Sequence, residues 1–391
     1  MTMRRERAFQ QQSHSLEIPF NRPSIVGREE AYMAEALSRG HISGDGEFTR
    51  RCQELLVREL GVGAALLTTS CTHALEMAAI LLEISPGDEV LVPDFTFVST
   101  ANAFVLRGAR PVFVDIRPDT LNLDESLLEG LITPRTRAIC PVHYAGIGCD
   151  MEAIGRIAGA HGLAIIEDNA HGLFARRSGR FLGTYGQLAA LSFHETKNFY
   201  CGEGGALLVN DPALVERAEI VREKGTDRKR YFRGEVDKYT WVDVGSSYVI
   251  SDLLAAFLLG QLEERKKVLS LRRAIFERYL SGLETWAASH GVTLPRVPSD
   301  CQSSYHMFYL VLPDAAARTR LIEALRARGI LAVFHYLPLH RSRMGRRFAV
   351  PGSHFPVTDA VSERLVRLPF YNTLTEPEQS TVIETILSTP L

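Results

Sequence analysis

The sequence predicts an α/β protein: a large domain built on a mostly parallel β-sheet, followed by a smaller C-terminal α+β domain. Three observations lead to this prediction. Between about residues 60 and 210, short apolar runs alternate with longer segments of helical character. The short runs are almost continuously apolar, which is typical of strands covered on both faces. The chain has 391 residues, which is too long for one ordinary core and favours two domains.

The elements of the large domain follow from this alternation. Seven apolar runs are predicted to be strands, at 64–69, 89–92, 111–115, 138–142, 163–167, 188–193 and 206–210. Segments of helical character separate the first strands, at 72–82, 99–107, 124–131 and 151–161. Helices between successive strands favour parallel pairing.

A long helix is predicted next, from about residue 250 to 286, broken or bent around 262–267. Residues 254–258 are nearly all apolar, so the first half of this helix should be buried. Strands at 307–312 and 331–336 then flank a charged helix at 314–328, and a final helix starts near residue 377. We therefore expect an N-terminal tail (1–17), a large domain (18–262) and a small domain (263–391).

Composition and charge exclude several classes of protein. Hydrophobic residues make up 46% of the chain and charged residues 23%, the balance of a soluble globular protein. The formal net charge of −2 argues against a nucleic-acid or membrane partner. No apolar run approaches the roughly 20 residues that cross a bilayer. The polar N-terminus lacks the apolar core of a secretion signal, and the six cysteines show no CxxC pair. We expect a cytoplasmic protein without disulfides or a metal site.

Lys197 is the only lysine among the first 223 residues, in a chain with 44 Lys plus Arg. It follows the apolar run 188–193 and precedes a glycine-rich turn at 202–205. Arginine stays protonated, whereas surroundings can deprotonate a lysine amine so that it attacks a carbonyl. Lys197 is therefore a candidate Schiff-base lysine. The alternative is an exposed lysine that ends a strand.

Asp168 directly follows the predicted strand 163–167. Ligands gather beyond the carboxyl ends of strands in a doubly wound sheet. A carboxylate there suits a cofactor with a basic ring nitrogen, because it keeps the ring of pyridoxal phosphate protonated and electron-withdrawing. The alternative is that Asp168 caps the following turn.

Other candidates could hold the remaining parts of such a cofactor. Residues 69–73 form a turn of small residues before a helix, where amides and the Thr72 hydroxyl could bind phosphate. Ser192 could supply another hydroxyl, Phe97 could stack on a flat ring, and His171 could lie over that ring. Each has an ordinary alternative. The small residues at 69–73 could only cap the helix, Ser192 could be an ordinary strand serine, and Phe97 could be a core aromatic. His171 could simply bond a loop carbonyl.

Five runs carry a family resemblance, at 43–46, 108–115, 120–124, 167–172 and 192–198. They resemble the sugar aminotransferase family of fold-type I pyridoxal-phosphate enzymes, the DegT/DnrJ/EryC1/StrS type, over about residues 18 to 390. The resemblance implies that Lys197 holds the cofactor covalently and that Asp168 pairs with its pyridine nitrogen. It also implies that Phe97 stacks on the cofactor ring and that His171 packs near the ring and its 3-hydroxyl. The positions that hold the phosphate are Cys71, Thr72 and Ser192.

The chain departs from the family at one informative position. Many members read Gly-Tyr-Asn-x-Arg where this chain has Gly-Ser-Ser-Tyr at 245–248, so Ser247 is expected to replace the Asn that reaches the neighbouring subunit's phosphate. This variant, with the runs 238–241, 306–309 and 333–336, is similar to the dTDP-4-amino-4,6-dideoxygalactose transaminase subgroup. Such homodimers aminate the C4 ketone of dTDP-4-dehydro-6-deoxyglucose with L-glutamate, at sites on the subunit interface. Candidate substrate-binding residues in these runs are Tyr239, Trp241, His335 and Tyr336.

The nucleotide diphosphate of such a substrate needs cations. The loop 227–233 carries four in seven residues, so Lys229 and Arg230 are predicted to contact the pyrophosphate, with a solvated basic loop as the alternative.

Rival functions remain at this point. They are amination at C3, a pyridoxal-dependent dehydratase, a non-catalytic cofactor-binding regulator, and a nicotinamide-binding protein. The dehydratases replace the lysine with histidine. A nicotinamide-binding fold expects Gly-x-Gly-x-x-Gly after the first strand, which residues 69–72 do not supply. The C4 stereochemistry, galacto or gluco, stays open.

Overall fold

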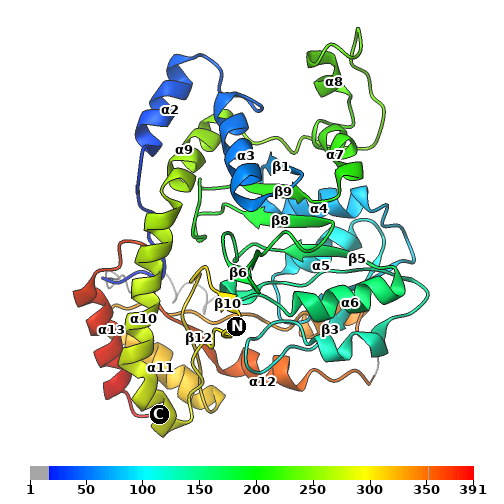
Figure 1. Ribbon diagram of the computed structural model, residues 1–391. Coiled ribbons are helices and arrows are strands. Elements are labelled where there is room, and N and C mark those ends of the chain that lie inside the picture. The colour runs from blue at the N-terminus through cyan, green and yellow to red at the C-terminus, as the bar shows by residue number, and fades with distance from the viewer. Residues whose placement is uncertain (1–16, 351) are drawn as a thin grey trace, which may run out of the picture.

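A computed structural model describes residues 17–350 and 352–391. The predicted tail therefore lies, except for Glu17, outside the described residues. At the centre is a seven-stranded sheet of order β1-β9-β8-β5-β4-β2-β3 (Figure 1). Strands β3, β2, β4, β5 and β8 run parallel, and β9 is antiparallel to both β8 and β1. The α/β class, the mostly parallel sheet and its seven strands are thus confirmed. The bounds are β1 (Ala64–Thr68), β2 (Glu89–Pro93), β3 (Arg110–Val114), β4 (Thr136–Ile139), β5 (Ala164–Asp168), β8 (Leu188–Ser192) and β9 (Gly205–Val209).

Helices cover both faces of this sheet, which explains why its strands are apolar without alternation. On one face, Leu66 and Leu207 share a core with α4 and α7; on the other, Leu67 and Leu208 share a core with α3 and α9. Successive residues of each strand point to opposite faces, so both faces need apolar side chains. The helices around the sheet are α2 (Glu29–Ser38), α3 (Glu47–Leu60), α4 (Cys71–Leu81), α5 (Val98–Val105), α6 (Met151–His161), α7 (Val215–Arg222) and α9 (Asp252–Glu263).

Local sequence signals set several helix ends. Helix α6 starts where the Asp150 carboxylate accepts a hydrogen bond from the amide of Ala153, and it ends at Gly162, whose φ of 63° favours glycine. The predicted break in the long helix is confirmed: α9 ends at Glu263, Glu264 leaves helical geometry, and α10 (Arg265–His290) follows.

The C-terminal part packs around a separate core that joins α10, α11 (Ala315–Ala327) and α13 (Glu376–Ser388). This core also takes in Ile18 from the start of the described chain, which pairs with Ile330. The division of the chain at residue 262 stays a prediction. Smaller elements complete the fold: α8 (Arg228–Phe232), and a three-stranded sheet of β10 (Cys301–Gln302), β6 (Arg176–Arg177) and β7 (Arg180–Phe181).

Two predicted elements were wrong. The segment 331–336 is not a strand; only Val333 pairs, with Arg367, and the chain then leaves the sheet towards Pro338, which has no amide hydrogen to donate. The strand that pairs with β11 (Tyr309–Val311) is β12 (Leu365–Arg367), which follows α12 (Pro356–Arg364). The segment 124–131 forms two 3-10 turns instead of one helix. There the Asp124 side chain bonds the amide of Ser126, which competes with regular helix.

No helix among the described residues combines the length and the apolar character that crossing a membrane requires.

Candidate active site

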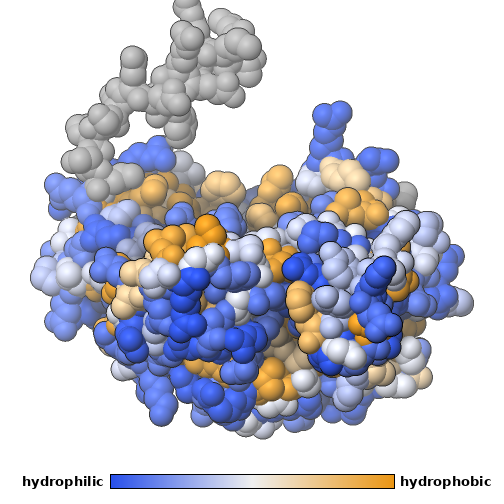
Figure 2. All heavy atoms as spheres, turned by 90° about the horizontal axis from the view of Figure 1, so that it is seen from above, coloured by the Kyte–Doolittle hydropathy of each residue, from blue (hydrophilic) through white to orange (hydrophobic). Residues whose placement is uncertain are grey.

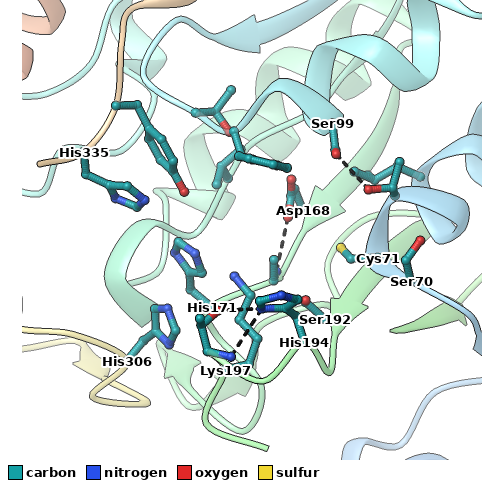
Figure 3. Close-up of a pocket in the computed structure, with 18 of the residues that line it drawn as sticks. Ser70, Cys71, Ser99, Asp168, His171, Ser192, His194, Lys197, His306 and His335 are labelled. Carbon is teal, nitrogen blue, oxygen red and sulfur yellow. Dashed lines mark hydrogen bonds between the residues drawn. The ribbon is translucent and has the colours of Figure 1, made fainter. Parts of the chain in front are cut away.

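A cavity of about 640 Å³ opens beyond the carboxyl ends of β5 and β8 and beside the start of α4 (Figure 3). Residues from distant parts of the chain line it, because parallel strands end at the same edge of the sheet. Nine residues predicted from the sequence lie on its walls: Cys71, Thr72, Phe97, Asp168, His171, Ser192, Lys197, His335 and Tyr336.

Lys197 extends into this cavity from the turn that follows β8, where its amide donates to the carbonyl of His194 at 2.9 Å. Burial is the main reason that the pKa of its amine falls from 10.5 to about 8. The nearby Cys71 and Asp168 oppose this change, and Arg367 adds to it. The exposed-lysine alternative therefore does not describe Lys197, whose lowered pKa leaves more of its amine in the unprotonated, nucleophilic form than in an ordinary lysine.

Asp168 is the last residue of β5 and is buried on the cavity wall. One carboxylate oxygen accepts a hydrogen bond from the Thr100 hydroxyl at 2.7 Å, and the other accepts from the amide of Ala170 at 3.2 Å. Burial raises the pKa of this carboxyl, while the Thr100 and Ala170 bonds and the Lys197 charge lower it. Asp168 thus bonds to the following turn, as the alternative supposed, and also faces the cavity.

The start of α4 forms an anion cradle at one end of the cavity. Ser70 caps the helix by accepting from the amide of His73, and the first turn leaves amides without partners inside the helix. The Thr72 hydroxyl bonds that of Ser99 at 2.7 Å. The helix starts directly above the sheet because residue 205 is glycine: a Cβ there would collide with the Ser70 carbonyl and the Cys71 amide.

Two stacked histidines form another wall. The rings of His171 and His306 lie 4.2 Å apart at 20°, and His306 Nδ1 bonds Asn198 Oδ1 at 2.9 Å. Burial holds the pKa of both imidazoles well below 6.5, so both are neutral. His171 Nδ1 is buried with no hydrogen-bond partner among the described residues. A buried nitrogen in this state is suited to a ligand that enters the cavity.

Five predicted residues lie away from this cavity: Ser247, Lys229, Arg230, Tyr239 and Trp241. Lys229 and Arg230 belong to α8, which projects from the top of the molecule (Figure 1), and they pair with acidic residues of their own chain, Glu219 at 3.1 Å and Glu235 at 3.3 Å. Trp241 is 80% exposed. Within one chain the structure does not bring these residues to the site, and their roles stay predictions.

Three residues of the cavity region were missed. Thr100 was not singled out because a threonine in a predicted helix gives no local sign that it bonds a residue 68 positions away. His306 stood only within a run quoted for the family resemblance. Arg367 carried no signal in the sequence, since an arginine near a strand is ordinary on a surface.

Comparison with known proteins gives the site a chemical identity. The sequence pattern described as the DegT/DnrJ/EryC1/StrS aminotransferase family matches residues 23–387. The chain belongs to this family. The chain is 32% identical to the spore coat polysaccharide biosynthesis protein SpsC of Bacillus subtilis, in an alignment that covers 96% of this chain and 97% of SpsC.

Solved structures of other aminotransferases share the fold of this family member. The aminotransferase TlmJ from Streptoalloteichus hindustanus is 30% identical with a TM-score of 0.86, covering 96% of this chain and 98% of TlmJ. The PLP-form of the putative sugar aminotransferase Spr1654 from Streptococcus pneumoniae is 27% identical with a TM-score of 0.86, covering 95% and 98%. The chain is therefore a fold-type I aminotransferase whose cofactor is pyridoxal 5′-phosphate.

The residues present fit this cofactor. The cradle at the start of α4 suits its phosphate, and the buried carboxylate of Asp168 suits its ring nitrogen. His171 offers an unpaired nitrogen, and Phe97, 56% exposed, offers a ring face on the cavity wall. The cavity amine of Lys197, whose pKa is lowered to about 8, suits covalent attachment to the cofactor aldehyde.

Proposed function

We propose that this chain, a sugar aminotransferase of its family, transfers the amino group of L-glutamate to the C4 ketone of dTDP-4-dehydro-6-deoxyglucose. The product is a dTDP-4-amino-4,6-dideoxyhexose. The observation that carries the proposal is one cavity holding Lys197, Asp168 and the anion cradle of α4, the set that amino transfer with pyridoxal phosphate needs. The nucleotide sugar rests on the runs around Tyr239 and Tyr336.

In this proposal the chain's own residues move protons and hold charge. Lys197 would hold the cofactor covalently, and its amine, once free, would move a proton at the reacting substrate carbon. A pKa near 8 lets one amine both accept and return that proton. Asp168 would hold the ring nitrogen of the cofactor positive, and the cofactor, when bound, would supply the electron sink. Thr100 holds the Asp168 carboxylate in place.

The nucleotide end of the substrate is proposed to be held across a homodimer. Lys229 and Arg230 lie on the projecting α8, from which they are proposed to reach the pyrophosphate at a partner subunit's cavity. Tyr239 lies 6.0 Å from the ring of Tyr231 on this helix, Trp241 pairs with Thr226 just before it, and Ser247 pairs with Glu223.

The projecting arm is the segment 226–247, which includes α8. Four exposed apolar side chains on this arm support an interface: Phe232, Trp241, Val242 and Val244. Figure 2, which views the molecule from the top of Figure 1, shows apolar patches interrupting the charged surface on this face.

Incubation of the holoenzyme with L-glutamate and dTDP-4-dehydro-6-deoxyglucose tests the substrate proposal. The expected product carries nitrogen at C4, and proton coupling constants in its NMR spectrum assign the amine as axial or equatorial. Amination of a 3-keto nucleotide sugar instead would replace the C4 assignment. Cofactor binding without formation of any product would favour the rival function of a non-catalytic cofactor-binding regulator.

Borohydride reduction followed by peptide mass spectrometry tests the chemistry, and an adduct on a residue other than Lys197 would refute it. A location in the cytoplasm, with neither a membrane nor a nucleic-acid partner, is part of the proposal.

A further inference from the structure

The C-terminal part of the chain is bonded to the loop before α5 through a buried carboxylate. Asp94 follows β2 directly, and its side chain is fully buried. One carboxylate oxygen accepts a hydrogen bond from the amide of His340 at 2.8 Å, and the other lies 2.6 Å from His340 Nδ1. The Asp94 carbonyl accepts from the amide of Leu339 at 3.1 Å. Because an ionised carboxylate only accepts, the His340 ring carries a hydrogen on Nδ1.

His340 therefore fixes the position of loop 94–97. Among the residues that the structure describes, His340 alone donates to the Asp94 carboxylate, so its removal would leave a buried acceptor without a partner. The amide of Asp94 donates to the Val114 carbonyl at 2.8 Å, which ties the same residue to β3. The loop then runs directly into α5, whose N-cap is Phe97. A shift of Asp94 would be passed on to the residues that follow it.

Two hydroxyls connect this loop with Asp168. Thr96 and Thr100 are buried, and their hydroxyl oxygens lie 2.8 Å apart. The Thr100 oxygen lies 2.7 Å from the carboxylate of Asp168. A hydroxyl has one hydrogen to donate, and Thr100 gives its hydrogen to the carboxylate. Thr96 must therefore donate to Thr100, and both bonds point towards Asp168.

The direction of these bonds has an energetic consequence. A hydroxyl that accepts a hydrogen bond donates a stronger one, because neighbouring bonds polarise each other where little water screens them. Burial raises the pKa of the Asp168 carboxyl, and the Thr100 bond is the largest influence that lowers it. A backbone amide, Lys197 and His143 also lower this pKa. Thr96 should thus help Thr100 to keep Asp168 ionised.

We propose that Thr96 and His340 are positioning residues for Asp168. His340 fixes the loop before α5, and Thr96 orients the Thr100 hydroxyl that holds the carboxylate. The consequence for catalysis rests on the proposed function, in which Asp168 pairs with the cofactor ring. His340 also follows the segment 334–337, which lines the cavity, so one set of bonds fixes that wall and Asp168 together.

The first test measures the pKa of Asp168 by infrared titration of the cofactor-free protein, with the carboxyl band identified by its absence from Asp168→Asn. Thr96→Val and His340→Leu should each raise this pKa by about 0.3 to 1, a roughly two- to tenfold change in proton affinity for one hydrogen bond. Thr96→Ser keeps the hydroxyl, and His340→Asn keeps an N–H at the position of Nδ1, so both should preserve the wild-type pKa. The matched control is His354→Leu, which removes an exposed histidine from the same part of the chain.

Turnover by the holoenzyme then separates a role at Asp168 from general support of the fold. Thr96→Val and His340→Leu should each lower kcat about two- to tenfold. The same changes made in Asp168→Asn should lower kcat by less than about twofold further, because the carboxylate that they position is gone. Losses of equal size in both backgrounds would overturn the proposal, as would an unchanged Asp168 pKa in Thr96→Val and His340→Leu.

The role of Asp168 itself is tested separately. Near-normal turnover of Asp168→Asn would refute its proposed role in catalysis, while the infrared titration would still decide whether Thr96 and His340 act on its carboxyl. Should His340→Leu fail to fold, His340→Gln replaces it. A glutamine amide reaches the position of Nε2 rather than Nδ1, so this variant should raise the Asp168 pKa where His340→Asn does not.

Discussion

The buried amine of Lys197 should cost the cofactor-free protein stability, and the cost should depend on pH. A pKa lowered from 10.5 to about 8 corresponds to roughly 3 kcal/mol of unfavourable free energy in the protonated folded state. Lys197 keeps some contact with the open cavity, so we expect about 2–3 kcal/mol. Lys197→Met removes the charge and should stabilise the apoprotein by this amount at pH 7.

The sign of the pH dependence follows from the same values. Below pH 8 both the folded and the unfolded chain hold the proton, so the full penalty is present. Between about pH 8 and 10.5 the folded chain releases the proton while the unfolded chain keeps it, and the penalty disappears. The stability advantage of Lys197→Met should therefore be largest at pH 7 and shrink steadily towards pH 10.

Urea unfolding of the cofactor-free proteins at pH 7, 8.5 and 10 measures this difference. The matched control is Lys266→Met, which removes an exposed lysine from α10 and should show no comparable pH-dependent gain. An advantage that stays constant with pH, or a variant less stable than wild type at pH 7, would refute the argument that burial destabilises the Lys197 charge.

Three further predictions concern the residues around the cofactor and the projecting arm. Asp168→Asn should retain the cofactor absorbance but lose at least about 100-fold in kcat, because an amide does not hold the ring nitrogen protonated; near-normal turnover would contradict this. Thr100→Val should lower kcat about tenfold and stability by about 1 kcal/mol, whereas Thr100→Ser keeps the hydroxyl that bonds Asp168 and should restore both. Reversing the charges of Lys229 and Arg230 together should raise KM for the nucleotide sugar at least about tenfold and leave conversion by glutamate alone nearly unchanged; an unaltered KM would remove these residues from the substrate site.

Some features of this protein are local in the sequence and were predicted from it. The strand pattern was readable because every strand of a doubly covered sheet must be apolar on both faces. Asp168 was identifiable because it stands at the end of such a strand, and Lys197 because it is the only lysine among the first 223 residues and comes shortly after another strand. Strand ends in this architecture meet at one edge. The break in the long helix was also local, since the apolar residues 254–258 give way to a charged stretch.

Other features depend on which distant segments the fold brings together. The Thr100 hydroxyl bonds Asp168, which is 68 residues away in the sequence, and His306 bonds Asn198, which is 108 residues away. Arg367 bonds His335 close to the point where β12 pairs with Val333, in the segment predicted to be a strand. No periodicity records such pairings, because they arise from the packing of whole elements. The sequence by itself determined the sheet and predicted the candidate lysine and carboxylate at its edge. Only the tertiary structure decided which side chains would hold that carboxylate and stack beside the ring site.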